Sequence, residues 1–145
     1  MRAPFQILAI PYRKRQKWEF CVFHRVDMDQ YQFVAGGGEM GETAAQAAGR
    51  EIREETGMEA PFVLPLTSMA YIPADVIAEK ERKAWDRETF VIPEYAFGFP
   101  CNREIRLSAE HVGYEWLGYE EALSRLTWDS NKTALYELHC RLQAD

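Results

Sequence analysis

Residues 36–58, GGGEMGETAAQAAGREIREETGM, constrain the fold of this 145-residue chain more than any other segment. Thr43 is expected to cap a helix, because its hydroxyl can accept a hydrogen bond from Gln46, whose side chain completes a capping box. The alanines that follow favour helix, and Gly57 is suited to end it in a left-handed conformation. Residues 36–41 are too rich in glycine for regular structure, so we expect a tight loop whose backbone can approach the helix and a ligand closely.

Three carboxylates share one face of this predicted helix. Glu51, Glu54 and Glu55 stand at the i, i+3, i+4 spacing that brings side chains together. Like charges at this spacing repel each other, and Arg50 can offset only part of the repulsion through an i, i+4 pair with Glu54. Hard divalent cations such as Mg²⁺ would supply the missing positive charge. The alternative is a solvated acidic face without a ligand.

A stripe of the helix adjacent to the glutamate face is expected to face the core. Ala45, Ala48 and Ile52 form an apolar stripe, while Arg53 points toward solvent. Ala47 lies one turn before Glu51 on the same face and is small enough to leave room for the glycine loop.

The rest of the chain mixes strands and helices in one predicted domain, residues 1–145. Alternating or β-branched segments predict strands at residues 4–12, 18–24, 32–35, 62–71, 89–99 and 113–117, with a turn at 13–16. Amphipathic segments predict two helices at 120–126 and 131–142. The predicted fold class is α/β, with a mixed β-sheet sandwiched between α-helices.

Charge and composition exclude several partners. The chain carries 23 acidic and 17 basic residues and a net charge of -6, whereas proteins that grip a nucleic acid polymer are usually basic. No segment approaches the roughly 18 apolar residues that span a membrane, and the N-terminus lacks the pattern of a signal peptide. Cys21, Cys101 and Cys140 show no metal-ligand or disulfide spacing. We therefore expect a cytoplasmic protein that does not bind a nucleic acid polymer, and a small phosphorylated molecule bound through metal remains open as the ligand.

The helical segment also matches a known motif at every fixed position. The Nudix box is G-x5-E-x7-R-E-U-x-E-E-x-G-U, where U is a bulky aliphatic residue. The matching residues are Gly36, Glu42, Arg50, Glu51, Ile52, Glu54, Glu55, Gly57 and Met58. The chain therefore resembles the Nudix hydrolases, and the strand pattern around the box also suits the Nudix fold.

This resemblance implies a metal-dependent pyrophosphohydrolase. Mg²⁺ or Mn²⁺ would be held by box carboxylates and one backbone carbonyl, those of Glu51, Glu54, Glu55 and Gly36. Arg50 and Glu42 would mainly orient these carboxylates. Catalysis would depend on Glu54, Glu51 and Arg50, with Glu54 favoured as the base that takes a proton from the attacking water. The products would be a monophosphate and pyrophosphate or a phosphorylated remainder.

A narrower resemblance concerns the substrate. The stretches SAEHVGYEWL and LTWDSNKTAL resemble the bacterial dihydroneopterin triphosphate pyrophosphatases, which also act on deoxynucleoside triphosphates such as dATP. The resemblance implies a further metal ligand at Glu110, which could equally be an ordinary surface residue. It places substrate contacts at Arg2, Arg25, Tyr31, Ala35, Ser130 and Asn131. Tyr31 and Trp128 would either stack on a flat ring or pack in the core, and the two arginines would either bind phosphate or solubilise the surface.

The chain departs from these patterns at three places. Ala35 stands where many Nudix members have glycine, Tyr31 stands where the narrower group has tryptophan, and residues 73–90 match neither. That charged segment is expected to form a loop or short helix over the site and to influence substrate choice. Three alternatives remain open: a hydrolase of ADP-ribose or other nucleoside-diphosphate sugars, for which Pro73 is a weak indication, a hydrolase of oxidised nucleotides, and a non-catalytic nucleotide-sensing domain.

Overall fold

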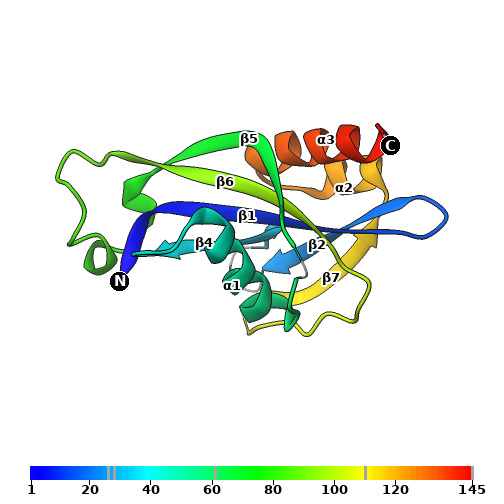
Figure 1. Cartoon of the computed structure of the whole chain (residues 1–145), viewed down its shortest axis with the longest axis horizontal. Helices are drawn as coiled ribbons and strands as arrows, with labels where there is room; N and C mark the ends of the chain where they lie inside the picture. Colours follow the sequence, from blue (N-terminus) through cyan, green and yellow to red (C-terminus); the bar gives the residue numbers. More distant parts are fainter. Residues whose placement is uncertain (26, 28, 61, 110, 145) are drawn as a thin grey trace.

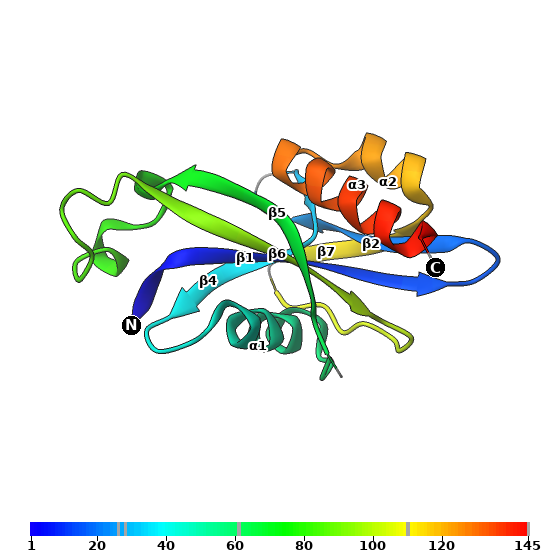
Figure 2. The same cartoon turned by 45° about the horizontal axis from the view of Figure 1, so that its top comes forward.

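A mixed β-sheet lies between α1 (Ala44–Thr56) on one face and α2 (Tyr119–Arg125) with α3 (Asp129–Gln143) on the other (Figure 1 and Figure 2). The computed structural model describes residues 1–25, 27, 29–60, 62–109 and 111–144. This arrangement confirms the predicted fold class, a mixed sheet sandwiched between helices. Within the described residues, no helix is long and apolar enough to cross a membrane.

The sheet contains one parallel pair among antiparallel ones. Its strands are β1 (Arg2–Lys14), β2 (Trp18–Arg25), β3 (Tyr31–Gln32), β4 (Val34–Glu39), β5 (Leu64–Pro73), β6 (Val91–Pro100) and β7 (His111–Leu117). The main order is β3-β2-β1-β6-β5, with β4 paired to β1 and β7 paired to β2. The central pair, β1 with β6, is parallel and runs from Gln6↔Glu94 to Tyr12↔Pro100.

The long strand β1 changes partner along its length, and this positions the site. Its first part pairs with β4, from Arg2↔Glu39 to Ala9↔Val34, and its last part pairs with β2. The chain passes from β3 to β4 at Phe33, whose backbone N–H donates to Oδ1 of Asn131 at 3.0 Å. Strand β4 contains the glycine run and lies directly beneath α1, where Glu51 of the helix contacts Gly36.

Alternating side chains of the strands build a core on each face of the sheet. On the α1 face, Ile7, Phe23 and Phe97 pack with Ile52 of the helix. On the other face, Leu8 and Phe20 pack with Leu135 of α3. The sheet is therefore held rigidly between the helices that carry the candidate site residues.

Helix α1 has the predicted ends and a partly different core face. The backbone N–H of Gln46 donates to the Thr43 hydroxyl at 3.1 Å and Thr43 N–H donates to Gln46 Oε1 at 2.9 Å, which completes the capping box. Gly57 ends the helix with φ of 75°. Ala48 and Ile52 are buried as predicted, but Ala45 is exposed. Ala47 is fully buried in its place, because it packs directly over the sheet.

The prediction of a loop at the glycine run was wrong. Gly36 and Gly37 lie inside β4 and pair with Ile7 and Gln6 of β1. These strand positions need glycine because side chains of other elements occupy the space in which a Cβ atom would lie, as described below for Gly36. Residues 73–90 contain two short 3-10 helices, Ala74–Val76 and Glu79–Glu81, which lie at one end of the molecule (Figure 1).

Candidate functional site

The carboxylate of Glu51 lies directly on the backbone of Gly36. A Cβ atom added at Gly36 would stand 2.1 Å from Cδ of Glu51, closer than any real contact allows. The glycine that begins the motif is therefore required by the close approach of α1 to β4. This places the Glu51 carboxylate, only 13% exposed, beside the main chain of Gly36, the residue predicted to supply a metal-binding carbonyl.

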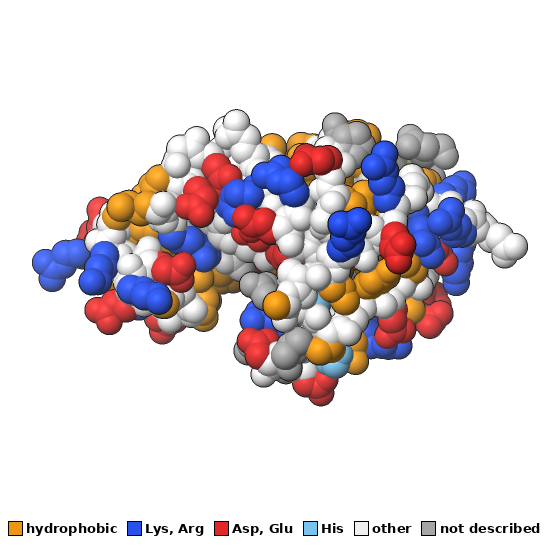
Figure 3. Space-filling view, turned by 90° about the horizontal axis from the view of Figure 1, so that it is seen from below, with side chains coloured by type: hydrophobic (Ala, Val, Ile, Leu, Met, Phe, Trp, Pro, Cys, Tyr) orange, Lys and Arg blue, Asp and Glu red, His pale blue; other side chains and the backbone are white. Residues whose placement is uncertain are grey.

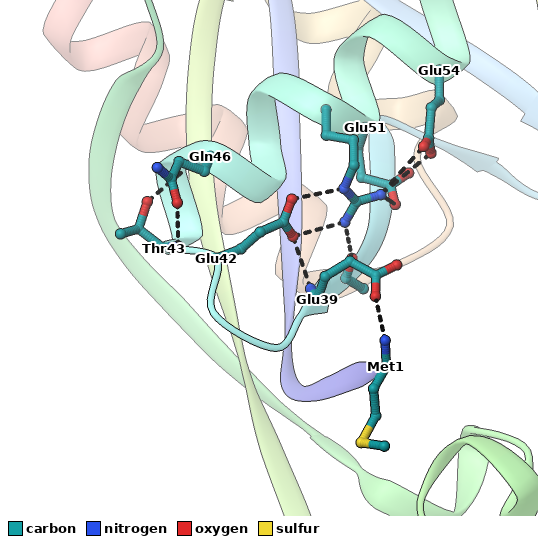
Figure 4. Close-up of polar contacts among 9 residues, drawn as sticks. Met1, Glu39, Glu42, Thr43, Gln46, Glu51 and Glu54 are labelled. Atoms are coloured by element: carbon teal, nitrogen blue, oxygen red, sulfur yellow. Dashed lines mark hydrogen bonds and ion pairs between the residues drawn. The ribbon is translucent and has the colours of Figure 1, made fainter.

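Arg50 is the centre of the polar network on this face, and Figure 4 labels the glutamates around it, Glu42, Glu51 and Glu54. Its guanidinium donates twice to Glu42, with Nε to Oε2 at 2.8 Å and Nη2 to Oε1 at 3.0 Å. Nη2 also donates to the carbonyl of Gly37 at 2.8 Å. Nη1 lies 3.1 Å from Glu51 Oε1 and 3.4 Å from Glu54 Oε2. One planar group thus joins the strand, the loop before the helix and two carboxylates of the helix.

The charges in this network shift the pKa values of its carboxyl groups in opposite directions. The hydrogen bonds from Arg50 are the largest cause that lowers the pKa of Glu42, and the N–H of Glu39 adds to it. Burial is the largest cause that raises the pKa of Glu51, and the charge of Glu54 raises it further, against hydrogen bonds with Glu55 and Arg50. The charge and hydrogen bond of Arg50 therefore lower the pKa of Glu51 by less than its burial and the charge of Glu54 raise it.

The three helix glutamates differ sharply in exposure. The side chain of Glu54 is 55% exposed, whereas that of Glu55 is 4% exposed and lies with Oε1 3.8 Å from Nε2 of His111. Glu51 and Glu55 are in hydrogen-bond contact. The predicted common face therefore exists, but it runs from solvent at Glu54 into the interior at Glu55. Glu110, the predicted further ligand, lies outside the described residues.

The donors suit a hard divalent cation in chemical type, since carboxylate and carbonyl oxygens are the ligands that Mg²⁺ and Mn²⁺ prefer. Among the described residues, however, no group of three or more His, Cys, Asp or Glu side chains converges closely enough to hold a metal ion. Nη1 of Arg50 lies within ion-pair distance of both Glu51 and Glu54, and it therefore holds these two carboxylates beside each other.

Two cavities adjoin this network and share two residues, Arg2 and Gly37. The smaller cavity, about 530 Å³, is lined by Arg50, Glu51 and Glu54 and also by Lys80 and Glu81 of the 73–90 segment. In the space-filling view the surface is notched beside the lobe formed by that segment (Figure 3). The segment therefore borders the acidic site, as the sequence predicted.

The larger cavity, about 980 Å³, lies on the α3 side of the sheet and brings together most of the predicted substrate contacts. Its lining includes Arg2, Arg25, Ala35, Ser130 and Asn131. Trp128, 45% exposed, lines it as well. The cavity is large enough for a nucleotide-sized ligand.

Arg2 connects the two cavities. Its Nη2 donates to Oε1 of Gln6 at 2.9 Å, and its guanidinium covers Gly37, where an added Cβ would lie 2.0 Å from Cζ. The Nε atom of Arg2 is buried and has no hydrogen-bond partner among the described residues. An unsatisfied buried guanidinium N–H is costly, so this side chain is well suited to an anionic ligand.

Two further predicted contacts have other partners. Arg25 forms a two-point pair with Asp27, with distances of 3.1 Å from Nε and 2.9 Å from Nη2. The ring of Tyr31 stacks on His24, with centroids 4.4 Å apart, and Tyr31 is absent from the described lining of the larger cavity. Of the two aromatic candidates, Trp128 rather than Tyr31 faces the cavity.

The lining residues of the larger cavity that the sequence interpretation missed include Gln6 and Glu94. Gln6 was counted only as part of a strand, and Glu94 lies in a strand with no motif around it. The one available signal was a charged residue within an otherwise apolar strand segment, VIPEYAFGFP, because a charge is rarely buried without a partner or function.

Comparison with known proteins gives one consistent family. The family model described as NUDIX domain matches residues 4–138. A crystal structure of a proposed NUDIX hydrolase from Listeria monocytogenes is 41% identical, with a TM-score of 0.86 over 98% of this chain and 96% of that one. The dihydroneopterin triphosphate diphosphatase of Escherichia coli is 28% identical over 92% of this chain and 91% of its own length. Its structure has a TM-score of 0.75, with 26% identity over 95% of this chain and 97% of that one.

Other relatives match only in part. The asymmetrical bis(5'-nucleosyl)-tetraphosphatase of Mus musculus is 38% identical over 68% of this chain. The matched region spans 63% of that mouse protein. An octanoyltransferase from Myxococcus xanthus is 35% identical over 66% of this chain, and that matched region spans 25% of the octanoyltransferase.

Proposed function

This chain belongs to the NUDIX family of hydrolases, which act on pyrophosphate bonds, and we propose that its substrate is a pterin or deoxynucleoside triphosphate. Dihydroneopterin triphosphate and dATP are the leading candidates. The products would be the monophosphate and pyrophosphate. The proposal is supported by the likeness to the Escherichia coli enzyme, which extends over almost the whole of both chains.

Glu51, Glu54 and Glu55 are proposed to hold Mg²⁺ or Mn²⁺, with help from the Gly36 carbonyl and Glu110. When bound, these ions would neutralise diphosphate oxygens and lower the pKa of an attacking water. Glu54 is the proposed base, and its exposed carboxylate beside the smaller cavity supports this role. Arg50 and Glu42 would orient Glu51 and Glu54 through the network of hydrogen bonds described above.

The shared border of the two cavities is the single observation that carries the substrate proposal. Glu51 and Glu54 line the acidic cavity, Trp128 lines the larger cavity, and Arg2 and Gly37 line both. A triphosphate lying over β4 could therefore place its phosphates near Glu51 and its ring in the larger cavity. Arg2 would contact the phosphate chain, and Arg25 would approach it by exchanging Asp27 for phosphate.

The ring of the substrate is proposed to lie against Trp128. An exposed indole beside a cavity offers a flat apolar face, on which pterins and purines can stack. Ser130 and Asn131, in the first turn of α3, would supply polar contacts. Ala35 would border the ring from the sheet.

A substrate panel tests this proposal. Dihydroneopterin triphosphate, dATP, dGTP, ADP-ribose and diadenosine tetraphosphate would be compared with Mg²⁺ under identical conditions, and products separated by ion-exchange chromatography. We expect the highest kcat/KM for a triphosphate, with pyrophosphate as a product. A clear preference for ADP-ribose would contradict the proposal.

A second candidate substrate is a dinucleoside tetraphosphate. It is supported by the mouse tetraphosphatase, which is 38% identical over the matched region. Faster turnover of diadenosine tetraphosphate than of every triphosphate, with ATP and AMP as products, would establish this candidate instead.

A further inference from the structure

The carboxyl group of Glu94 is buried on the wall of the larger cavity. Glu94 is 7% exposed and belongs to β6, where it pairs with Gln6 of β1. It lines the larger cavity together with Ser130 of α3, and it therefore faces the side of the sheet that α3 covers. A buried carboxylate in a largely apolar strand is costly unless hydrogen-bond donors surround it.

The donors around Glu94 are neutral and incomplete. The hydroxyl of Ser130 and the side-chain amide of Gln6 hydrogen-bond to its carboxylate, and burial nevertheless raises its pKa. Among the described residues no cation is paired with it; Arg2 donates to Gln6 rather than to Glu94. A carboxylate has about four acceptor positions, so about two remain open toward the cavity.

The position of Glu94 fits a role in reading the substrate ring. Gly37, Gln6 and Glu94 lie side by side on β4, β1 and β6. Neighbouring strands are about 4.8 Å apart, so Glu94 lies about 10 Å across the sheet from Gly37. The phosphate-facing end of the cavity at Gly37 and the carboxylate are thus separated by roughly the length of a nucleoside.

We infer that Glu94 is a specificity-determining residue, which accepts two hydrogen bonds from a ring that presents adjacent N–H and amino groups. Rings of this class have a 2-amino-4-oxo-pyrimidine edge, as guanine and pterin do. A carboxylate is complementary to this edge because both of its oxygens accept and both ring groups donate. Adenine presents one donor and one acceptor, which matches the carboxylate less well. The inference deepens the proposed function and depends on it for the orientation of the ring.

Binding of two monophosphates that differ by one amino group tests this inference independently of catalysis. Isothermal titration calorimetry would measure the Kd of dGMP and of dIMP, which lacks the 2-amino group. For the wild-type chain we expect dGMP to bind about 10-fold more tightly or better. In Glu94→Gln the side-chain amide opposes the amino group of the ring, so the ratio should fall to about one. Glu120→Gln, at an exposed carboxylate, should keep the wild-type ratio.

The thermal unfolding midpoint of each variant controls for folding. Glu94→Asp provides a second variant, which keeps the charge and should retain a preference for dGMP.

Equal binding of dGMP and dIMP to the wild type, an unchanged ratio in Glu94→Gln, or no binding of either nucleotide would overturn the inference. If no triphosphate is hydrolysed but the preference exists and requires Glu94, the proposed reaction fails while the assignment of Glu94 stands. If triphosphates are hydrolysed with equal dGTP and dITP efficiency in both proteins, only the assignment of Glu94 fails.

Discussion

The carboxylate of Glu51 occupies the space in which a side chain at Gly36 would lie, with 2.1 Å between its Cδ and the position of an added Cβ. Helix α1 and strand β4 therefore pack as a single unit, and neither element alone forms this part of the site. This contact holds the half-buried carboxylate of Glu51, which lines the smaller cavity, against Gly36 of β4, which lines the larger cavity.

Gly36→Ala should remove most of the hydrolase activity. The methyl group must displace either the Glu51 carboxylate or the β4 backbone, and we expect a loss in kcat/KM of about 100-fold. Steady-state kinetics on the best triphosphate would measure it. Gly49→Ala is the matched control, because a Cβ at Gly49 meets nothing within 4 Å. That helix substitution should leave activity unchanged and raise stability by up to about 1 kcal/mol. Full activity in Gly36→Ala would show that the contact is dispensable.

Arg50→Lys should lower activity about 10- to 100-fold. Lysine retains the charge but cannot reproduce the planar fork that joins Glu42, Glu51 and the Gly37 carbonyl. The kinetics of Arg53→Lys provide the comparison, since Arg53 is exposed and, within the described part of the chain, its one ion pair is with Glu59 at 3.5 Å. Equal activity of the two variants would argue against an orienting role for Arg50.

Mg²⁺ should stabilise the folded chain in the absence of substrate. A cation that binds only the folded state adds about 2.7 kcal/mol at a concentration 100 times its Kd. Differential scanning calorimetry should therefore show an unfolding midpoint that rises with Mg²⁺ and returns with chelator. In Glu51→Gln/Glu54→Gln this rise should disappear. A rise of equal size in the double variant would place the stabilising ion elsewhere.

Glu137 links α3 to the edge strand β5 and should make stability depend on pH. Its carboxylate accepts from the N–H groups of Thr67 and Ser68, at 2.7 Å each, and from Arg141 at 2.7 Å. Burial by itself raises the pKa of Glu137, but the hydrogen bonds from Ser68, Thr67 and Arg141 outweigh it and lower the pKa to about 2.

Because the folded-state pKa lies below the ordinary value of 4.5, the stabilisation is complete above pH 4.5 and is lost as pH falls toward 2. Glu137→Gln should lower the free energy of unfolding by about 2 kcal/mol at pH 7. Its difference from the wild type should shrink between pH 4.5 and 2 in urea titrations. A difference that stays constant over this interval would contradict the assignment.

Much of this architecture could be predicted from local patterns. The capping box at Thr43 and the left-handed Gly57 depend on neighbouring residues only, so helix α1 was located correctly. The carboxylate spacing likewise depends on helix geometry, and the pair between Arg50 and Glu54 exists as predicted.

Features that depend on distant contacts were not predictable in the same way. The glycines of β4 were expected in a loop because their neighbours in space, such as Glu51, cannot be known from β4 alone. Tyr31 stacks on His24 across the β2–β3 pair, a contact set by register. Glu94 was not predicted as a site residue, because the cavity that it lines is formed with Ser130, which lies far along the chain.

The box glutamates are proposed to support metal-dependent cleavage of a triphosphate. Pyrophosphate release from the best substrate would be followed for the wild type with Mg²⁺ and with chelator, and for Glu54→Gln with saturating Mg²⁺. Glu59→Gln, at an exposed carboxylate just beyond α1, is the control. We predict release that requires Mg²⁺, falls about 100-fold or more in Glu54→Gln and is unchanged in Glu59→Gln. Release that persists with chelator, or near-normal turnover by Glu54→Gln, would contradict the account.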